Sequence, residues 1–137
     1  MRHHVTVRIA ASPADVWAVL ADVLAWPTWT PTVTSVAALS RALDVGSRYW
    51  VKRPGALPAV WEVTDCVPEE SFAWATRIAG SRIAAGHRLA GDGAGSTVTI
   101  TLDHTGGLAG PLDLLLGKRI RRMVDVEAAN LKARCET

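Results

Sequence analysis

The sequence predicts an α+β fold, in which an antiparallel β-sheet of about seven strands is covered on one face by a long C-terminal helix. Strand-like segments follow one another with only short turns between them. Neighbours joined in this way are antiparallel, because parallel strands need long crossover connections. Helical periodicity over residues 111–136 predicts one long helix. An antiparallel sheet buries one face, and no other segment is long enough to cover it.

The N-terminal region predicts one strand and two short helices. Residues 4–10 alternate apolar and polar side chains, which is the period of a half-buried strand. Ser12-Pro13-Ala14-Asp15 is typical of a helix start, with a serine N-cap, a proline at the first helical position and an acid in the first turn. Apolar spacings of three and four extend this helix to Val23. Two prolines in residues 25–31 leave room for a single short helical turn or a loop.

The middle of the chain predicts six further strands, separated by glycine and proline. Gly91-Asp92-Gly93-Ala94-Gly95 is typical of a hairpin turn between the last two. After a glycine-rich connection at residues 105–110, Pro111 opens the long helix. The predicted strands are residues 33–43, 47–53, 59–67, 72–78, 82–90 and 96–104.

Length and composition limit the classes of function. The 137 residues suit one domain, residues 1–137, and a composition 49% hydrophobic and 20% charged excludes a disordered tail. No apolar run approaches the roughly 20 residues that cross a bilayer, and the N-terminus has no secretory h-region. The net charge is only +2, so we expect no nucleic-acid partner and no integral membrane contact. Cys66 and Cys135 form no CxxC pair, and free thiols fit a cytoplasmic location.

Familiar catalytic motifs are absent. The sequence has no HExxH, no GxSxG, no Walker motif and no GxGxxG before a helix, and His3-His4 has no third spaced ligand. We therefore expect neither a metal nor a cofactor. The densest basic stretch, Lys118-Arg119-Ile120-Arg121-Arg122, is interpreted as a solvated helix face, with a contact to an anionic ligand group as the alternative. It contains no aromatic residue, which argues against single-stranded nucleic acid.

The order of elements, with several short motifs, resembles the START-like or SRPBCC superfamily, and within it the polyketide cyclase/dehydratase-like group. The motifs are Ile9-Ala10-Ala11-Ser12-Pro13-Ala14-Asp15-Val16-Trp17, Trp26-Pro27-Thr28-Trp29, Trp61-Glu62-Val63, Phe72-Ala73-Trp74 and Leu131-Lys132. The resemblance covers nearly the whole chain and implies the helix-grip fold, a curved sheet wrapped around the last helix with a cavity between them. It is not specific for function, because the superfamily includes cyclases, hydrolases, lipid carriers, hormone receptors and chaperone regulators.

Alternation along the strands predicts which side chains face this cavity. Two neighbouring strands each present an apolar face that includes a histidine. We expect Phe72, Trp74, Trp61 and Val63 to face inward as well. For the strand that contains Tyr49 and Trp50, either residue could point inward. The two histidine-bearing faces are Ile83, Ala85, His87 and Leu89, and Val98, Ile100, Leu102 and His104.

His87 is the first candidate for proton transfer, His104 the second and Tyr49 the third, because imidazole exchanges protons near neutral pH. The alternative for each of them is a structural residue of the core whose hydrogen bonds are satisfied within the protein. Asp65 could orient a histidine, but a solvated strand end is favoured. For Glu127 a surface salt bridge is favoured over a place in the cavity.

The candidate ligand contacts are mostly tryptophans, whose faces stack on rings, together with aliphatic side chains from the strands and the long helix. Plain core packing is the alternative for each tryptophan. The candidates are Trp26, Trp29, Trp50, Trp61, Trp74, Ile83, Ile100, Leu116, Ile120 and Met123.

Two functions from different classes follow. One is a cofactor-independent enzyme that cyclises or dehydrates an aromatic or polyketide-like molecule by general acid–base chemistry. The other is a non-catalytic carrier or sensor of a lipid, quinone or other apolar metabolite, which needs the cavity but no proton carrier. An interaction protein with a filled core is a third option. In each case we expect a monomer or homodimer.

Overall fold

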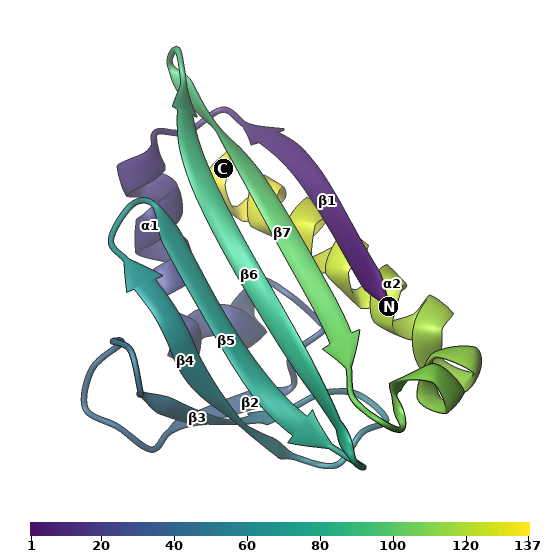
Figure 1. Cartoon of the computed structure of the whole chain (residues 1–137). Coiled ribbons are helices and arrows are strands. Elements are labelled where there is room, and N and C mark those ends of the chain that lie inside the picture. The colour runs from purple at the N-terminus through teal and green to yellow at the C-terminus, as the bar shows by residue number, and fades with distance from the viewer.

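Seven antiparallel strands form one sheet, in the order β1-β7-β6-β5-β4-β3-β2, in the computed structural model, which describes residues 1–137 (Figure 1). The predicted α+β class is confirmed, including the two short helices after the first strand. The strands are β1 (Arg2–Ile9), β2 (Ser35–Ala38), β3 (Arg48–Lys52), β4 (Ala59–Val67), β5 (Ser71–Ile78), β6 (Ser81–Asp92) and β7 (Gly95–Thr105). The helices are α1 (Pro13–Ala21), the 3-10 helix η1 (Val23–Thr28) and α2 (Ala109–Cys135).

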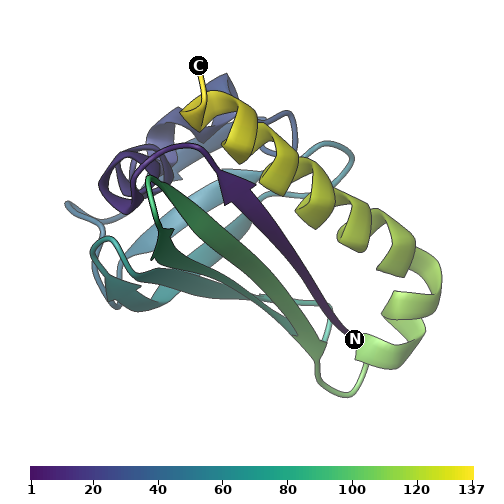
Figure 2. The ribbon, with the colours of Figure 1, turned by 90° about the horizontal axis from the view of Figure 1, so that it is seen from above.

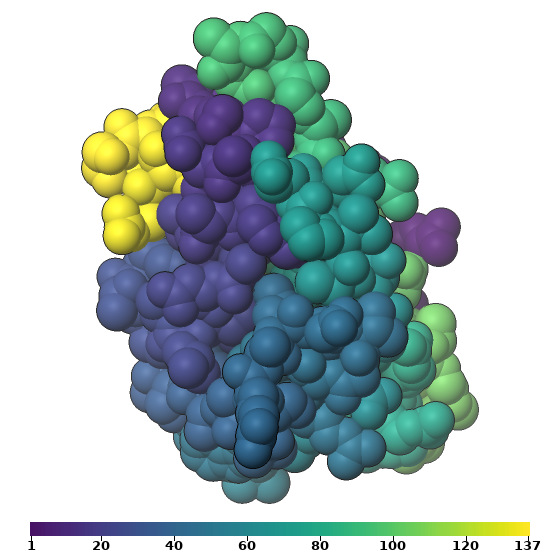
Figure 3. All heavy atoms as spheres, turned by 90° about the vertical axis from the view of Figure 1, so that its left-hand side faces the viewer, coloured from purple at the N-terminus to yellow at the C-terminus, as the bar shows by residue number.

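Helix α2 lies along one face of the sheet, as Figure 2 shows from above. It contacts β1 and β7, and its C-terminal end packs against α1. Figure 3 shows the C-terminal end of α2 in yellow beside the purple N-terminal segment. None of the helices has the length and apolarity to cross a membrane.

The local signals at the helix starts act as predicted. Ser12 caps α1, since its Oγ accepts a hydrogen bond from the Asp15 backbone N–H at 3.2 Å, and Pro13 opens the helix. Helix α2 begins two residues earlier than predicted, at Ala109. This start places Pro111 in the first turn, where a missing N–H breaks no hydrogen bond of the helix.

The strand predicted over residues 33–43 is wrong in its extent, because β2 is only four residues long. Its register pairs Ala38 with Tyr49, so the chain must turn back between these two positions. Ser47 stabilises this loop, since its hydroxyl donates to the Ala42 carbonyl and accepts from the Asp44 N–H.

The predicted inward faces are confirmed. The histidine-bearing face of β6 is buried at Ile83, His87 and Leu89, and the face of β7 from Val98 to His104 is buried at alternate positions. On β3 the ambiguity is resolved, because Tyr49 is buried and Trp50 points outward. Both histidines therefore face α2 from neighbouring strands.

Candidate functional site

A cavity of about 230 Å³ lies between the inner face of the sheet and α2. Its mouth is formed by the β3–β4 loop, the end of β5 and the first half of α2, where Leu57, Ile78 and Leu116 are exposed. The walls are aromatic on the β4–β5 side and aliphatic elsewhere. They include Trp61, Trp74, Ile83, Ile100, Leu102, Leu112, Leu116, Ile120, Met123 and Val124.

Apart from the indole N–H groups of Trp61 and Trp74, the polar side-chain groups that line this cavity are all ionisable. Of the 23 lining residues 16 are hydrophobic, and the side chains with polar atoms among the rest belong to Arg53, His87, His104, Arg119 and Glu127. No hydroxyl or amide side chain is among them. Polar recognition of a ligand in this cavity therefore depends on these charged groups and on the indole N–H groups of Trp61 and Trp74.

His87 and Glu127 form a buried ion pair across the interface between β6 and α2. Nε2 of His87 lies 3.0 Å from Oε1 of Glu127, and Nδ1 lies 3.1 Å from the Phe72 carbonyl oxygen. The carbonyl can only accept, so Nδ1 carries a proton. The imidazole also stacks on the Phe72 ring, with 5.4 Å between the ring centroids, and this contact fixes the orientation of the imidazole plane.

Glu127 is ionised at neutral pH despite its burial. Burial acts to raise the pKa of its carboxyl, but the hydrogen bond and charge of His87, with the charge of Arg53, outweigh it and lower the pKa. Nε2 of His87 consequently donates to Oε1. The second oxygen, Oε2, has no hydrogen-bond partner within the chain, and Glu127 lines the cavity. A free carboxylate oxygen with an imidazolium behind it is thus available to a ligand.

Arg53 brings a second cation to the cavity. Its Nη1 donates to the Thr32 carbonyl at 3.2 Å, and its guanidinium lies 5.5 Å from the centroid of the Trp61 ring. Burial lowers its pKa and the charge of Glu127 partly reverses this, yet a guanidinium is so strongly basic that it stays protonated. Arg53, His87 and Glu127 together give this part of the cavity one net positive charge.

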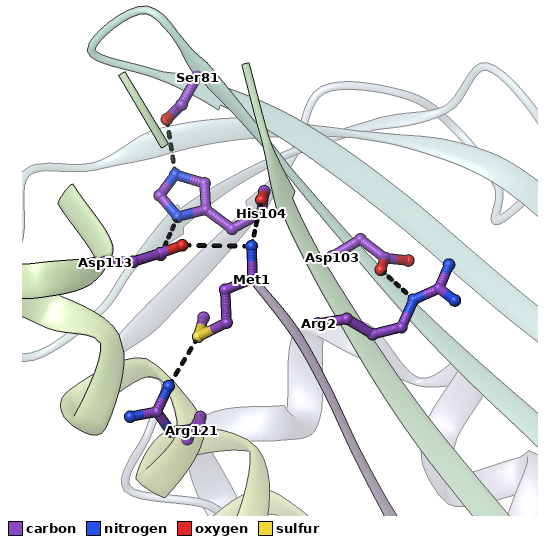
Figure 4. Close-up of polar contacts among 7 residues, drawn as sticks. All are labelled: Met1, Arg2, Ser81, Asp103, His104, Asp113 and Arg121. Atoms are coloured by element: carbon purple, nitrogen blue, oxygen red, sulfur yellow. Dashed lines mark hydrogen bonds and ion pairs between the residues drawn. The ribbon is translucent and has the colours of Figure 1, made fainter. Parts of the chain in front are cut away.

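His104 lies in a separate network toward the start of α2, shown in Figure 4. Its Nδ1 is 2.6 Å from Oδ1 of Asp113, and its Nε2 is 2.7 Å from Oγ of Ser81. The Ser81 hydroxyl donates to the Ile78 carbonyl, so Nε2 must be the donor toward Ser81. Burial acts to raise the pKa of Asp113, but its bonds from His104 and the amino group of Met1 lower it overall. Both ring nitrogens of His104 are therefore engaged in hydrogen bonds within the protein.

The cavity brings together nine of the thirteen residues predicted for the site. Four of the predicted residues lie outside its lining: Tyr49, Trp26, Trp29 and Trp50. The nine lining residues are His87, His104, Trp61, Trp74, Ile83, Ile100, Leu116, Ile120 and Met123.

The residues outside the lining form a second layer or lie on the surface. Trp26 is fully buried, its Nε1 donates to the Leu20 carbonyl at 3.0 Å, and its ring packs 5.2 Å from Trp74. Trp29 packs on Trp26, and Tyr49 packs on Trp74. Trp26 and Tyr49 consequently position a cavity wall from behind.

Sequence reasoning missed Arg53 and favoured the wrong place for Glu127. The surface position expected for Glu127 is wrong, because the side chain is buried against His87. A signal was present, since Glu127 follows Ile120 and Met123 at helical spacing on the face that lines the cavity. Arg53 carried no comparable signal, because it lies just past the end of β3. Asp65 is exposed and accepts from the Ser71 hydroxyl, with no histidine beside it.

A curved antiparallel sheet around one long helix, with an internal apolar cavity, defines the helix-grip fold. The model of the family described as polyketide cyclase / dehydrase and lipid transport matches residues 2–136. The chain therefore belongs to this family of the SRPBCC superfamily, which is associated with hydrophobic ligands and includes aromatase/cyclases. No curated protein matches the sequence.

Solved structures with the same fold include the Zhui aromatase/cyclase from Streptomyces sp. R1128, which has a TM-score of 0.78 at 20% identity and covers 99% of this chain and 93% of its own. A protein from Thermus thermophilus has a TM-score of 0.77 at 18% identity, and the alignment covers 98% of this chain and 97% of that protein. The di-domain aromatase/cyclase StfQ from the steffimycin pathway has a TM-score of 0.80 at 11% identity, with 96% of this chain and 49% of StfQ covered. At these identities the likeness concerns the fold alone.

Proposed function

We propose that this protein binds a ring-bearing apolar molecule in its cavity and moves a proton on it with the His87–Glu127 pair, as a cofactor-independent cyclase or dehydratase. One observation carries the proposal. A buried imidazolium–carboxylate pair, with one carboxylate oxygen free of protein partners, borders a cavity whose walls are mostly apolar. A perturbed acid–base pair in an apolar pocket is a site suited to proton transfer.

The cavity volume limits the substrate. An apolar cavity of about 150 Å³ accommodates benzene, so the 230 Å³ found here suits one or two rings. A longer molecule would extend through the mouth, where Leu57 and Leu116 are exposed. Trp61 and Trp74 supply flat apolar surfaces against which such rings would stack.

The proposed chemistry begins with a carbon between two carbonyl groups, which is acidic enough for a carboxylate to deprotonate. Oε2 of Glu127 would take this proton, and the cations of His87 and Arg53 would stabilise the enolate that forms. The enolate carbon would then bond to another carbonyl carbon of the same molecule. The resulting alkoxide would take back the proton from Glu127, and water would be lost in a later step.

A carrier or sensor of an apolar metabolite is the second candidate. The hydrogen bonds of the His87–Glu127 pair are already satisfied at Oε1 and both ring nitrogens, so the pair would be stable beside a ligand that does not react. The predominance of hydrophobic residues in the lining favours this function equally. A measurement of product formation distinguishes the enzyme from the carrier or sensor.

The first test is a tryptophan fluorescence titration with fatty acids, quinones and aromatic polyketides. Trp61 and Trp74 line the cavity, so a bound ring should quench their emission. Trp74→Phe should remove most of the quenching, whereas Trp50→Phe, a matched change on the outer face of β3, should leave it. Unchanged quenching in Trp74→Phe and Trp61→Phe would place the ligand outside this cavity.

The second test is turnover of any compound that binds. Glu127→Gln keeps the shape of the side chain and removes the base, so product formation should be lost while binding persists. Glu62→Gln on the exposed face of β4 is the matched control. Binding without turnover in the unmodified protein would favour the carrier.

We also propose a reducing, cytoplasmic location. Cys66 and Cys135 are both unpaired, and burial is the main cause that raises the pKa of each thiol. Thiols that stay protonated resist oxidation. Labelling of both cysteines in freshly lysed cells would support this location.

A further inference from the structure

One end of the sheet divides between β4 and β5. The pairing of these two strands ends at Glu62 and Ala75. Beyond this point, the first three residues of β4 pair only with β3, and the last three residues of β5 pair only with β6. A side-chain contact bridges the two, since the Thr76 hydroxyl donates to the Val60 carbonyl at 2.7 Å. The strands therefore diverge toward this end, and we call this divergence the β4–β5 fork.

The fork lies between the internal cavity and a groove on the outer face of the sheet, at the lower end of the sheet in Figure 1. Four residues border both the cavity and the groove, and two of them, Leu57 and Ile78, are exposed, so neither closes the boundary. A molecule too long for the cavity can therefore continue into the outer groove. The four shared residues are Ala56, Leu57, Ala59 and Ile78.

Two unpaired arginines are neighbours in this groove. The register places Arg77 of β5 directly opposite Arg82 of β6, and both side chains are exposed. Neither forms a salt bridge. Like charges at directly opposite positions of two strands destabilise the pair. An anion bound between the two guanidinium groups would replace this repulsion with two attractions.

The acid in the groove is already paired. Glu62 lies among the lining residues, and its Oε1 accepts a hydrogen bond from Nε of Arg48 at 3.0 Å. These two charges neutralise each other, so Arg77 and Arg82 leave the groove with two net positive charges. The groove therefore favours an anionic group, whereas the cavity beside it favours an apolar one.

We propose that the molecule bound in the cavity carries an anionic tail, a carboxylate or a phosphate ester, and that Arg77 and Arg82 bind this tail in the outer groove. Its rings would lie against Trp61 and Trp74, and the tail would pass the fork beside Leu57. A guanidinium donates two parallel N–H bonds to such an oxyanion, and these are stronger than bonds between neutral groups. The inference rests on the proposed binding of an apolar molecule in the cavity, and it does not require the proposed proton transfer.

Other positions for an anion fit the observations less well. Inorganic phosphate or an acidic peptide could use Arg77 and Arg82, but it would leave the shared border of the groove and the cavity without a role. A ligand whose acid group stays inside the cavity, beside Arg53, would leave the outer pair of arginines without a partner.

Isothermal titration calorimetry with naphthyloctanoic acid and its methyl ester tests the proposal. Both compounds have the same two rings and the same eight-carbon chain, but only the acid is charged. We expect the acid to bind about tenfold more tightly than the ester at low salt, and the difference to shrink in high salt. Equal affinities would overturn the inference and leave an apolar cavity ligand in place. Binding of neither compound would overturn both the inference and the proposed function.

Paired variants locate the anionic group. R77Q/R82Q removes the two cations of the groove, and R88Q/R134Q removes the same charge at exposed positions that do not line it. The first should lower the affinity for the acid about tenfold, to that of the ester, and leave the ester within about twofold. The second should change neither affinity by more than about twofold. Equal losses in both variants would mean that only net charge matters, and would overturn the inference.

Naphthoic acid, with its carboxylate directly on the ring, distinguishes the groove from the cavity. This carboxylate cannot reach the outer face of the sheet while the rings fill the cavity, so R77Q/R82Q should leave its affinity within about twofold. A tenfold loss would overturn the inference. A preference for naphthyloctanoic acid that survives in R77Q/R82Q would assign the carboxylate to Arg53 and His87 inside the cavity, and would also overturn it. Circular dichroism of both variants should match the unmodified chain, because every substituted side chain is exposed.

Discussion

Two histidines on neighbouring strands face the same helix, and each pairs with one of its carboxylates, yet the two sites differ in what they offer a ligand. His104 is held at both nitrogens by Asp113 and Ser81, and Asp113 is itself shared with the amino group of Met1. His87 is held by Phe72 and Glu127, but one oxygen of Glu127 remains free. Burial and a carboxylate partner are therefore common to both sites, and what distinguishes the His87 site is a carboxylate oxygen without a protein partner that borders the cavity.

The largest expected difference between the two sites is in turnover. His87→Gln removes the imidazolium behind Glu127, and we expect it to slow product formation by about 10²–10⁴-fold, the usual contribution of acid–base catalysis. His104→Gln should slow it less than about tenfold, because both ring nitrogens already serve the fold. Single-turnover rates measured with a compound that passes the fluorescence test check this. A larger loss in His104→Gln would reverse the roles assigned here.

Removal of the carboxylates should separate the two sites in stability. Glu127→Ala leaves a buried imidazole without its partner, and we expect it to lower the free energy of unfolding by about 3 kcal/mol. Asp113→Ala also leaves a buried imidazole without its partner, but Asp113 is 19% exposed and water can reach the groups it leaves, so we expect a smaller loss of about 2 kcal/mol. Urea denaturation of both variants measures the difference. Equal losses would mean that water reaches Glu127 as easily as Asp113.

Acid should weaken the His87–Glu127 pair in a defined direction. The folded chain lowers the pKa of Glu127, so its ionisation stabilises the fold fully above the ordinary value of about 4.3. This stabilisation is lost as the pH falls through the lower pKa of the folded state. The difference in unfolding free energy between the unmodified chain and Glu127→Gln should be constant from about pH 5 to pH 6 and shrink below about pH 4. A difference that grows in acid would contradict the lowered pKa.

The smallest expected effect is a change in ligand affinity caused by a substitution at the opening of the cavity. A Cβ at Gly55, where φ is +69°, would overlap the Arg119 guanidinium, whereas a Cβ at Gly46, where φ is +89°, would have nothing within 4 Å. Both alanine variants should lose about 1 kcal/mol of stability through left-handed backbone strain. Only Gly55→Ala should change ligand affinity, because it moves Arg119 at the opening. Fluorescence titration of both variants distinguishes backbone strain from a change in the mouth.

Most of the fold could be predicted because its signals are local. The Ser12 cap, the hairpin glycines after Asp92 and the alternation along β6 and β7 each act within a few residues. The strand predicted over residues 33–43 shows the limit. Its sequence is compatible with extended structure, but β2 ends where its pairing with β3 ends, and that length depends on the partner strand.

The sequence by itself determined the order of the elements and the inward direction of His87 and His104, since period-two alternation sets the face of a strand. Only the tertiary structure decided which residues meet. His87 and Glu127 lie 40 positions apart, and their contact depends on how α2 is rotated over the sheet. The same packing brings Arg53 to the cavity and leaves Trp26 behind its wall. No local pattern encodes the position of a helix across a sheet, because that position is set by the fit of both whole surfaces.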